Sequence, residues 1–159
     1  MNITIITVGK IKEKFYTQAI EEYSKRLSRY CTLKIIEVPD EKAPENLSPA
    51  EQQGIIDKEG KKIIEKIPVS STVITMEIEG KQLTSVDFSK EVEQFAINGQ
   101  SHLCFIIGGS LGLSQEVRTM SRLKLSFSKM TFPHQLFRVM LLEQIYRAFR
   151  IMRNEPYHK

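Results

Sequence analysis

The stretch from residue 102 to residue 134 constrains this chain most, because two strand-like runs there each end in an unusual loop. Residues 103–107 are apolar and stop at the sequence GGSLG of residues 108–112, which predicts a buried strand opening into a tight loop. Residues 123–127 alternate apolar and polar side chains before the sequence SKMTFPH of residues 128–134. In open α/β sheets, ligands bind beyond the carboxyl ends of the strands. Both loops are therefore candidates for a ligand site.

The rest of the chain alternates strand-like and helix-like segments. The first expected strand is Asn2–Val8, and a helix over residues 12–29 follows, with apolar side chains at helical spacing. Further strands are expected over residues 33–38 and 71–78, the second ending in a turn at Glu79-Gly80, and further helices over residues 49–66, 86–97 and 133–152. This order predicts an α/β fold with a mainly parallel sheet flanked by helices. The length fits a single domain, residues 1–159.

Composition points to an ordinary globular domain in a reducing compartment. The chain has 41% hydrophobic and 26% charged residues and two cysteines without CxxC spacing. No apolar run approaches the roughly 20 residues of a membrane span, and the first residues lack the layout of a signal peptide. The three histidines, His102, His134 and His158, lack metal-ligand spacing. We therefore expect a cytoplasmic protein without a membrane segment or a metal site.

Positive charge is concentrated towards the C-terminus. Residues 118–159 carry nine Lys and Arg against two Asp and Glu, a net charge of +7, whereas the first 117 residues carry fourteen against seventeen. A basic segment beside the two loops favours a polyanionic partner, and RNA or DNA is the simplest choice. The alternative is a solvated basic helix face without a partner.

The last expected helix has more apolar surface than one sheet can cover. Its apolar side chains span an arc of roughly 200° on a helical wheel, twice the stripe of a typical surface helix. No other helix is left to cover the excess, so we predict a two-fold homodimer. Glu143, Arg147 and Arg150 share the polar face of this helix, either as a simple ion pair or as functional side chains.

The glycine loop does not match the known phosphate-binding motifs. The first glycine of a GxGxxG dinucleotide motif would fall on Ile107, and no Gly-Lys-Ser/Thr closes the loop as in a P-loop. The serines at positions 110, 114 and 128 lack the setting of a nucleophile elbow. These loops therefore suit a flat, mostly neutral ligand better than a nucleotide phosphate.

Three segments in order resemble one enzyme family. They are GGSLG at residues 108–112, LSFSKMTFPHQLFRVMLLEQIYRA at residues 125–148 and NEPYHK at residues 154–159. With the opening ITIITVGKIKEKF, they are similar to the ribosomal RNA large subunit methyltransferase H family of the SPOUT class over essentially the whole chain. The resemblance implies an S-adenosylmethionine-dependent homodimer that methylates N3 of a pseudouridine in the 23S rRNA of the assembled ribosome. It also implies a trefoil knot near the C-terminus, which is rare among proteins.

The resemblance further implies which residues contact the cofactor. By position these are Met76, Gly108, Phe127, Ser128, Lys129, Met130, Thr131 and Phe132. Met76 stands where leucine is expected, a change that conserves volume. Apolar side chains can sandwich an adenine while loop N–H and C=O groups satisfy its edge. By residue type alone, Met76 and Phe127 would equally suit a simple core.

The reaction that the resemblance implies needs few protein groups. A sulfonium is a good leaving group, so positioning can supply much of the acceleration, but the N3 proton must still leave. His134 or His158 could act as general base; alternatively, the basic surface stabilises the imide anion while solvent takes the proton. The expected RNA-contacting residues are Glu143, Arg147, Arg150 and Tyr157. In a dimer the terminal segment, residues 154–159, could complete the partner's site. Alternatively, this segment is simply a frayed chain end.

A non-catalytic, ribosome-associated RNA-binding protein with the same fold is the main alternative function. Both readings predict the basic C-terminal segment, but only the enzyme predicts S-adenosylmethionine binding in the two loops. A nucleotide-binding regulator is less favoured, since the phosphate loops are missing.

Overall fold

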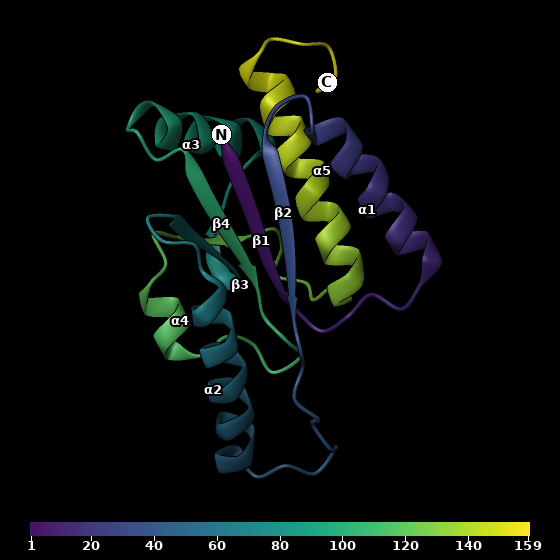
Figure 1. The fold of residues 1–159 in the computed structure, drawn as a ribbon, viewed down its shortest axis with the longest axis vertical. Helices are drawn as coiled ribbons and strands as arrows, with labels where there is room; N and C mark the ends of the chain where they lie inside the picture. Colours follow the sequence, from purple (N-terminus) through teal and green to yellow (C-terminus); the bar gives the residue numbers. More distant parts are fainter.

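The computed structural model describes residues 1–159 as one five-stranded sheet with helices on both faces (Figure 1). In chain order the elements are β1 (Asn2–Val8), α1 (Lys14–Leu27), β2 (Thr32–Val38), α2 (Pro49–Lys66), β3 (Thr72–Gln82), α3 (Ser85–Ile97), β4 (His102–Ile107), α4 (Gln115–Thr119), β5 (Leu123–Ser126) and α5 (His134–Met152). The strand order is β2-β1-β4-β3-β5, and every neighbouring pair is parallel. The predicted α/β fold with a parallel sheet is confirmed.

Two hydrophobic cores lie on opposite faces of the sheet, because successive strand side chains point to opposite sides. Helices α1, α3 and α5 cover the face that carries Ile3 and Phe105. Helices α2 and α4 cover the face that carries Ile6 and Ile106. This arrangement leaves the carboxyl ends of the strands to the connecting loops, where ligands of α/β proteins bind.

The predicted turn at Glu79-Gly80 is wrong, because β3 continues through these residues to Gln82. The pairing of β3 with β5 shifts register between Met76 and Lys81, so the chain bulges there instead of turning. A Cβ at Gly80 would lie 2.7 Å from the carbonyl oxygen of Lys124, and this close approach of two backbones requires glycine.

Helix α5 lies between α1 and α3 and contacts both (Figure 1). Its residues Leu141, Leu142 and Ile145 are fully buried in the core of that face. The premise that no other helix covers the wide apolar arc of α5 is therefore wrong. The homodimer stays a prediction, and α5 by itself does not require it.

Three simple features bear on the type of protein. No helix combines the length and the apolar character needed to cross a membrane. No three side chains of the types His, Cys, Asp and Glu are grouped so that they could hold a metal ion. Cys31 and Cys104 are free, and burial raises the pKa of the Cys104 thiol to about 12, so that thiol is not ionised at neutral pH.

Candidate active site

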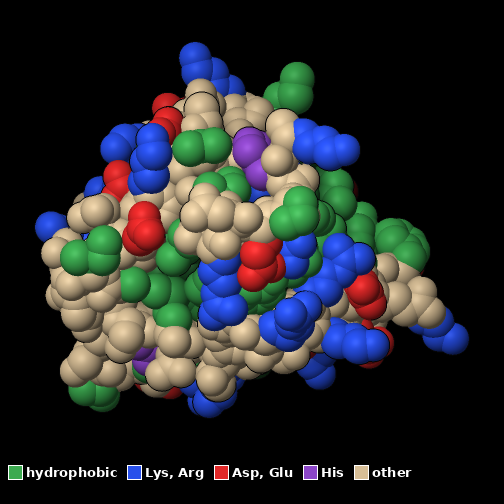
Figure 2. Space-filling model, turned by 90° about the horizontal axis from the view of Figure 1, so that it is seen from above, with side chains coloured by type: hydrophobic (Ala, Val, Ile, Leu, Met, Phe, Trp, Pro, Cys, Tyr) green, Lys and Arg blue, Asp and Glu red, His purple; other side chains and the backbone are tan.

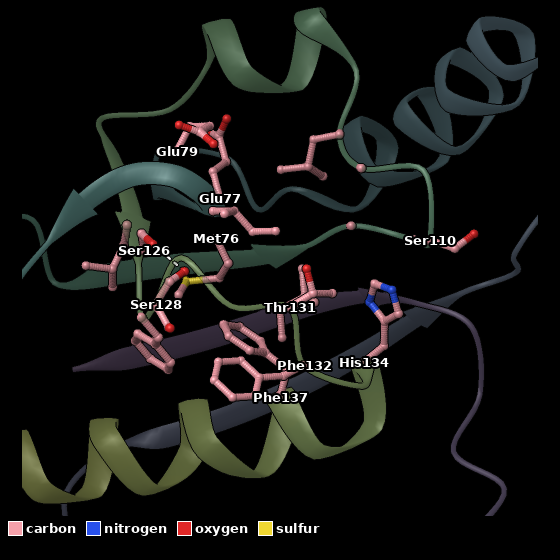
Figure 3. A pocket seen from close by; sticks show the side chains of 18 of the residues that line it. Met76, Glu77, Glu79, Ser110, Ser126, Ser128, Thr131, Phe132, His134 and Phe137 are labelled. Carbon is pink, nitrogen blue, oxygen red and sulfur yellow. Dashed lines mark hydrogen bonds between the residues drawn. The ribbon is translucent and has the colours of Figure 1, made fainter. Parts of the chain in front are cut away.

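A pocket of about 420 Å³ opens where the bulged part of β3 meets the carboxyl ends of β4 and β5 (Figure 3). Its walls come from residues 76–79 of β3, the glycine loop after β4, α4, the loop after β5 and the first turn of α5. The two loops singled out in the sequence thus contribute to one site. Its volume lies in the range of small-molecule sites, roughly 300–1,000 Å³.

Most of the residues predicted to contact a cofactor line this pocket. They are Met76, Gly108, Phe127, Ser128, Met130, Thr131 and Phe132. His134, a candidate base, lines the pocket as well. Lys129 does not line it, and its side chain is exposed.

The glycine loop leaves β4 through a tight turn. The N–H of Gly112 donates to the carbonyl of Gly109 at 3.1 Å, and Gly112 has a φ of +92°, which favours glycine. A Cβ at Gly108 would lie 2.9 Å from the Cδ2 atom of Leu113 and 3.1 Å from the carbonyl oxygen of Gly112. The wall at Gly108 therefore admits no larger side chain unless the loop moves.

The loop over residues 127–132 combines apolar side chains with free backbone groups. Its Ser128 Oγ accepts a hydrogen bond from the N–H of Met130 at 3.0 Å. The other N–H groups of residues 127–132 donate to no group of the chain. The rings of Phe127 and Phe137 lie beside them, with 5.1 Å between centroids. Apolar walls and unpaired polar backbone groups fit the adenosine part of S-adenosylmethionine.

His134 begins α5, and its imidazole lies at the pocket, next to Thr131 (Figure 3). Burial, followed by the charge of Arg138, lowers the pKa of His134 below its usual value of 6.5, while a hydrogen bond with the Gly108 backbone acts in the opposite direction. The imidazole is therefore largely neutral at pH 7. A neutral imidazole at a pocket can accept a proton.

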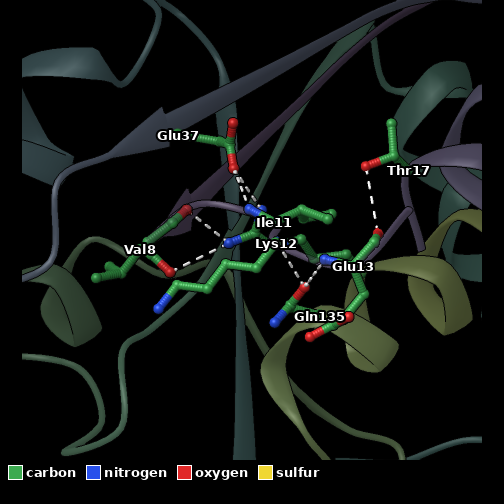
Figure 4. A network of polar contacts seen from close by, with 9 residues as sticks. Val8, Ile11, Lys12, Glu13, Thr17, Glu37 and Gln135 are labelled. Carbon is green, nitrogen blue, oxygen red and sulfur yellow. Dashed lines mark hydrogen bonds and ion pairs between the residues drawn. The ribbon is translucent and has the colours of Figure 1, made fainter. Parts of the chain in front are cut away.

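Arg138 fastens α5 to the ends of β1 and β2, within a network of polar contacts that includes Val8, Glu37 and Gln135 (Figure 4). It is 4% exposed, and its guanidinium donates to the carbonyls of Val8 at 3.2 Å and Gly9 at 2.7 Å. It also pairs with Glu37 at 2.8 Å. The nearby Gln135 Oε1 accepts two N–H groups of the loop after β1, at 2.9 and 3.4 Å. These contacts fix the first turn of α5, and with it His134, against the sheet.

The terminal segment is folded back on α5 and is not frayed. Arg147 pairs with Glu143 at 2.7 Å and lies 3.2 Å from Nδ1 of His158. The hydroxyl of Tyr157 donates to Glu143 at 3.0 Å. Burial and the Glu143 carboxylate raise the pKa of Tyr157 to about 12, so its hydroxyl keeps its proton. These four predicted residues form one cluster.

Arg150 joins a second cluster at the same end of α5. It donates to the hydroxyl of Tyr30 at 3.0 Å and to the carbonyl of Pro156 at 2.9 Å, and it pairs with Glu155. Seen from the end that carries both termini, Lys and Arg side chains are interleaved with acidic and apolar ones (Figure 2). The basic segment is thus no unbroken positive surface.

The two candidate bases do not come together within one chain. His158 contacts Arg147, which lies thirteen residues beyond His134 on the same helix. At 1.5 Å per residue these positions are roughly 20 Å apart. His134 is at the pocket, whereas His158 is held away from the pocket of its own chain.

Several pocket residues were not predicted from the sequence, among them Phe137, Glu77 and Arg118. The position of Glu77 directly after Met76 was a usable signal, because the strand predicted over residues 71–78 ends just after both. Nothing in the sequence indicated that Arg118 lies at the pocket, because only the fold brings α4 next to β3.

A family model described as "Predicted SPOUT methyltransferase" matches residues 1–158. The chain belongs to the SPOUT methyltransferase family, and its class of activity is methyl transfer.

Relatives with curated names narrow this class. The chain is 64% identical to "Ribosomal RNA large subunit methyltransferase H 1" of Clostridium perfringens (strain SM101 / Type A). It is 61% identical to "Ribosomal RNA large subunit methyltransferase H" of Clostridium tetani and 60% identical to the protein of that name from Clostridium beijerinckii. Each match covers 159 residues and 100% of both chains. The family resemblance seen in the sequence is confirmed.

A solved structure shares the fold. The "probable methylase family protein from Haemophilus influenzae Rd KW20" matches with a TM-score of 0.56 and 12% identity, over 99% of this chain and 70% of that one. At this identity the likeness shows a common fold alone.

Proposed function

We propose that this chain transfers a methyl group from S-adenosylmethionine to N3 of a pseudouridine in the 23S rRNA of the assembled ribosome, in the cytoplasm. The names of its relatives support methyl transfer to large-subunit rRNA. The observation that supports cofactor binding is that the loops after β4 and β5 line the same pocket, which has apolar walls and free backbone N–H groups. A non-catalytic RNA-binding protein would have no use for such a pocket.

S-adenosylmethionine, when bound, supplies an electrophilic methyl group on a good leaving group. Gly108 and residues 127–132 would hold the adenosine part, and the phenylalanine side chains would keep water away from it. His134 Nδ1 or Nε2 would accept the N3 proton, because the imidazole is neutral at pH 7 and lies at the pocket. The chain's own task is therefore to position two reactants and to remove one proton.

The test is transfer of labelled methyl groups. Ribosomes that lack the modification should accept label from S-adenosylmethionine, and the label should be found in 23S rRNA. Calorimetry with the free protein should show S-adenosylmethionine binding. Binding of ribosomes without any binding of the methyl donor would instead favour the non-catalytic alternative.

The pH dependence of transfer tests the role of His134. Because its pKa is lowered, transfer should persist below pH 6.5 and fall as the pH drops through the pKa of the folded protein. Arg138→Met removes a positive charge that lowers this pKa, so the acid limb should move to higher pH. Rate–pH profiles and an NMR titration of the His134 imidazole measure both effects.

Two further variants control this experiment. Arg138→Lys keeps the charge and should restore the original profile, whereas Arg122→Met removes an exposed charge that lines no part of the pocket and should leave it unchanged. An unaltered His134 titration in Arg138→Met would contradict this role of Arg138.

We further propose that the protein works as a homodimer in which the terminal segment of one chain completes the site of the other. The position of His158 supports this, since it is ordered on Arg147 yet lies roughly 20 Å along α5 from its own pocket. Two-fold symmetry would bring the same segment to both sites.

We also propose that residues near the C-terminus form a trefoil knot. Strand β5 lies at the sheet edge beside β3, whereas α5 starts against the end of β1, beyond β3 and β4. Residues 127–133 must therefore cross the ends of both strands, which supports threading. A single molecule pulled from its two ends should stop short of roughly 3.3–3.6 Å per residue; full extension would argue against the knot.

A further inference from the structure

A charged pair lines the pocket wall away from His134 and Phe137. Glu77, in the bulged part of β3, and Arg118, on α4, both line the pocket. The Arg118 Nε lies 3.1 Å from the Glu77 Oε1, and the Glu77 side chain is 11% exposed. In Figure 3, Met76 stands between Glu77 and the aromatic side chains near α5. The pocket thus has an apolar end and a charged end.

The Glu77 carboxylate is held in a fixed position. The hydroxyl of Thr75, which is fully buried, donates to Glu77 Oε2 at 2.6 Å. The same hydroxyl lies 2.8 Å from the hydroxyl of Ser121, which donates to the carbonyl of Leu123. A carboxylate supported from behind in this way presents a constant acceptor to the pocket.

Both members of the pair keep unused hydrogen-bonding capacity. A guanidinium has five N–H donors, and the Arg118 Nε pairs with Glu77 at 3.1 Å without forming a hydrogen bond. A carboxylate can accept about four hydrogen bonds, and Glu77 accepts from Thr75 and lies beside Arg118. The pair can therefore bind a zwitterion without separating.

We propose that Glu77 and Arg118 bind the amino-acid end of the methyl donor, Glu77 its ammonium group and Arg118 its carboxylate. This inference rests on the proposed function, and it extends the site beyond the adenosine contacts. The donor has a flat heteroaromatic end and a zwitterionic end, and the two ends of the pocket match them in chemistry. Bonds between charged groups of this kind are the stronger hydrogen bonds of proteins.

Two ligands that differ only at the amino-acid end test this assignment. S-adenosylhomocysteine carries the zwitterion, and 5′-methylthioadenosine lacks it. By calorimetry, Glu77→Gln and Arg118→Gln should each lower the affinity for S-adenosylhomocysteine by about tenfold or more. Both variants should change the affinity for 5′-methylthioadenosine by less than about twofold. Arg118→Lys should retain most of the S-adenosylhomocysteine affinity, because it keeps the positive charge.

Matched controls remove nearby charges that do not line the pocket. Glu116→Gln, on the same helix as Arg118, and Arg122→Gln should bind both ligands as the wild type does. Melting temperatures show that each variant is folded.

Three outcomes would overturn the assignment in different ways. An equal loss of affinity for both ligands would mean that the pair only shapes the whole pocket. Unchanged affinity for both ligands, with a lowered melting temperature, would mean that the pair only stabilises the contact between β3 and α4. A wild-type protein that binds neither ligand would overturn the proposed function itself, and the assignment with it.

Discussion

Gly108→Arg should abolish binding of S-adenosylmethionine, lowering the affinity by more than about a hundredfold. The reason is space, because a side chain here enters volume already taken by the neighbouring loop. A Cβ at Gly108 would lie 2.9 Å from Leu113 Cδ2 and 3.1 Å from the Gly112 carbonyl oxygen. The methyl of Leu113 can give way, but the Gly112 backbone closes the tight turn and cannot move freely. Calorimetric titration of the folded variant with the donor measures the loss.

Gly54→Arg is the matched control for this substitution. Gly54 lies on α2, and nothing lies within 4 Å of a Cβ built there. This variant introduces the same side chain at an open position and should bind the donor with wild-type affinity. Wild-type affinity in Gly108→Arg as well would show that the donor binds away from the glycine loop.

The pocket loops could be predicted from sequence because their signals are local. An apolar run that ends in glycines, and an alternating run that ends in Ser128, mark two strand ends by composition alone. Parallel strands put such ends on one edge of a sheet, so a shared site follows from the fold class. What composition did not show was which strands are neighbours, and hence that Met76 lies between the two loops.

Features that depend on distant segments could not be predicted in this way. The dipeptide Glu79-Gly80 is a turn signal, and only the pairing with β5, more than forty residues later, carries the strand through it. The apolar arc of α5 is covered by α1, which lies more than a hundred residues earlier in the chain. In the first case tertiary contacts override a local turn signal. In the second case the fold decides which helix covers α5, and no local signal shows it.

The polar residues of α5 also made contacts that could be predicted from the sequence only in part. Their helical spacing correctly brought Glu143 and Arg147 together, at 2.7 Å. Spacing could not show that Tyr157 and His158 fold back onto this pair. The cluster therefore holds the terminal segment in place, and any contact of these residues with RNA must start from that ordered arrangement.

His158→Ala should keep donor binding but lose methyl transfer by about a hundredfold. The donor pocket is lined by His134 and not by His158, so binding to the free protein should not change. Transfer should fall because the terminal segment is proposed to complete the partner's site. His102→Ala is the control, since His102 bonds to Thr4 at 2.8 Å at the opposite end of β4 and lines no part of the pocket. Labelled methyl transfer to ribosomes measures both variants.

Mixing two inactive chains decides whether the segment acts across a dimer. A Gly108→Arg chain has no usable pocket but an intact terminal segment. A His158→Ala chain has an intact pocket but an inactive terminal segment. Because His158 is held roughly 20 Å along α5 from its own pocket, the mixed dimer should contain one complete site. Random pairing would then restore about a quarter of wild-type transfer. If each chain needed its own tail, every site in the mixture would lack one part, and no activity would return.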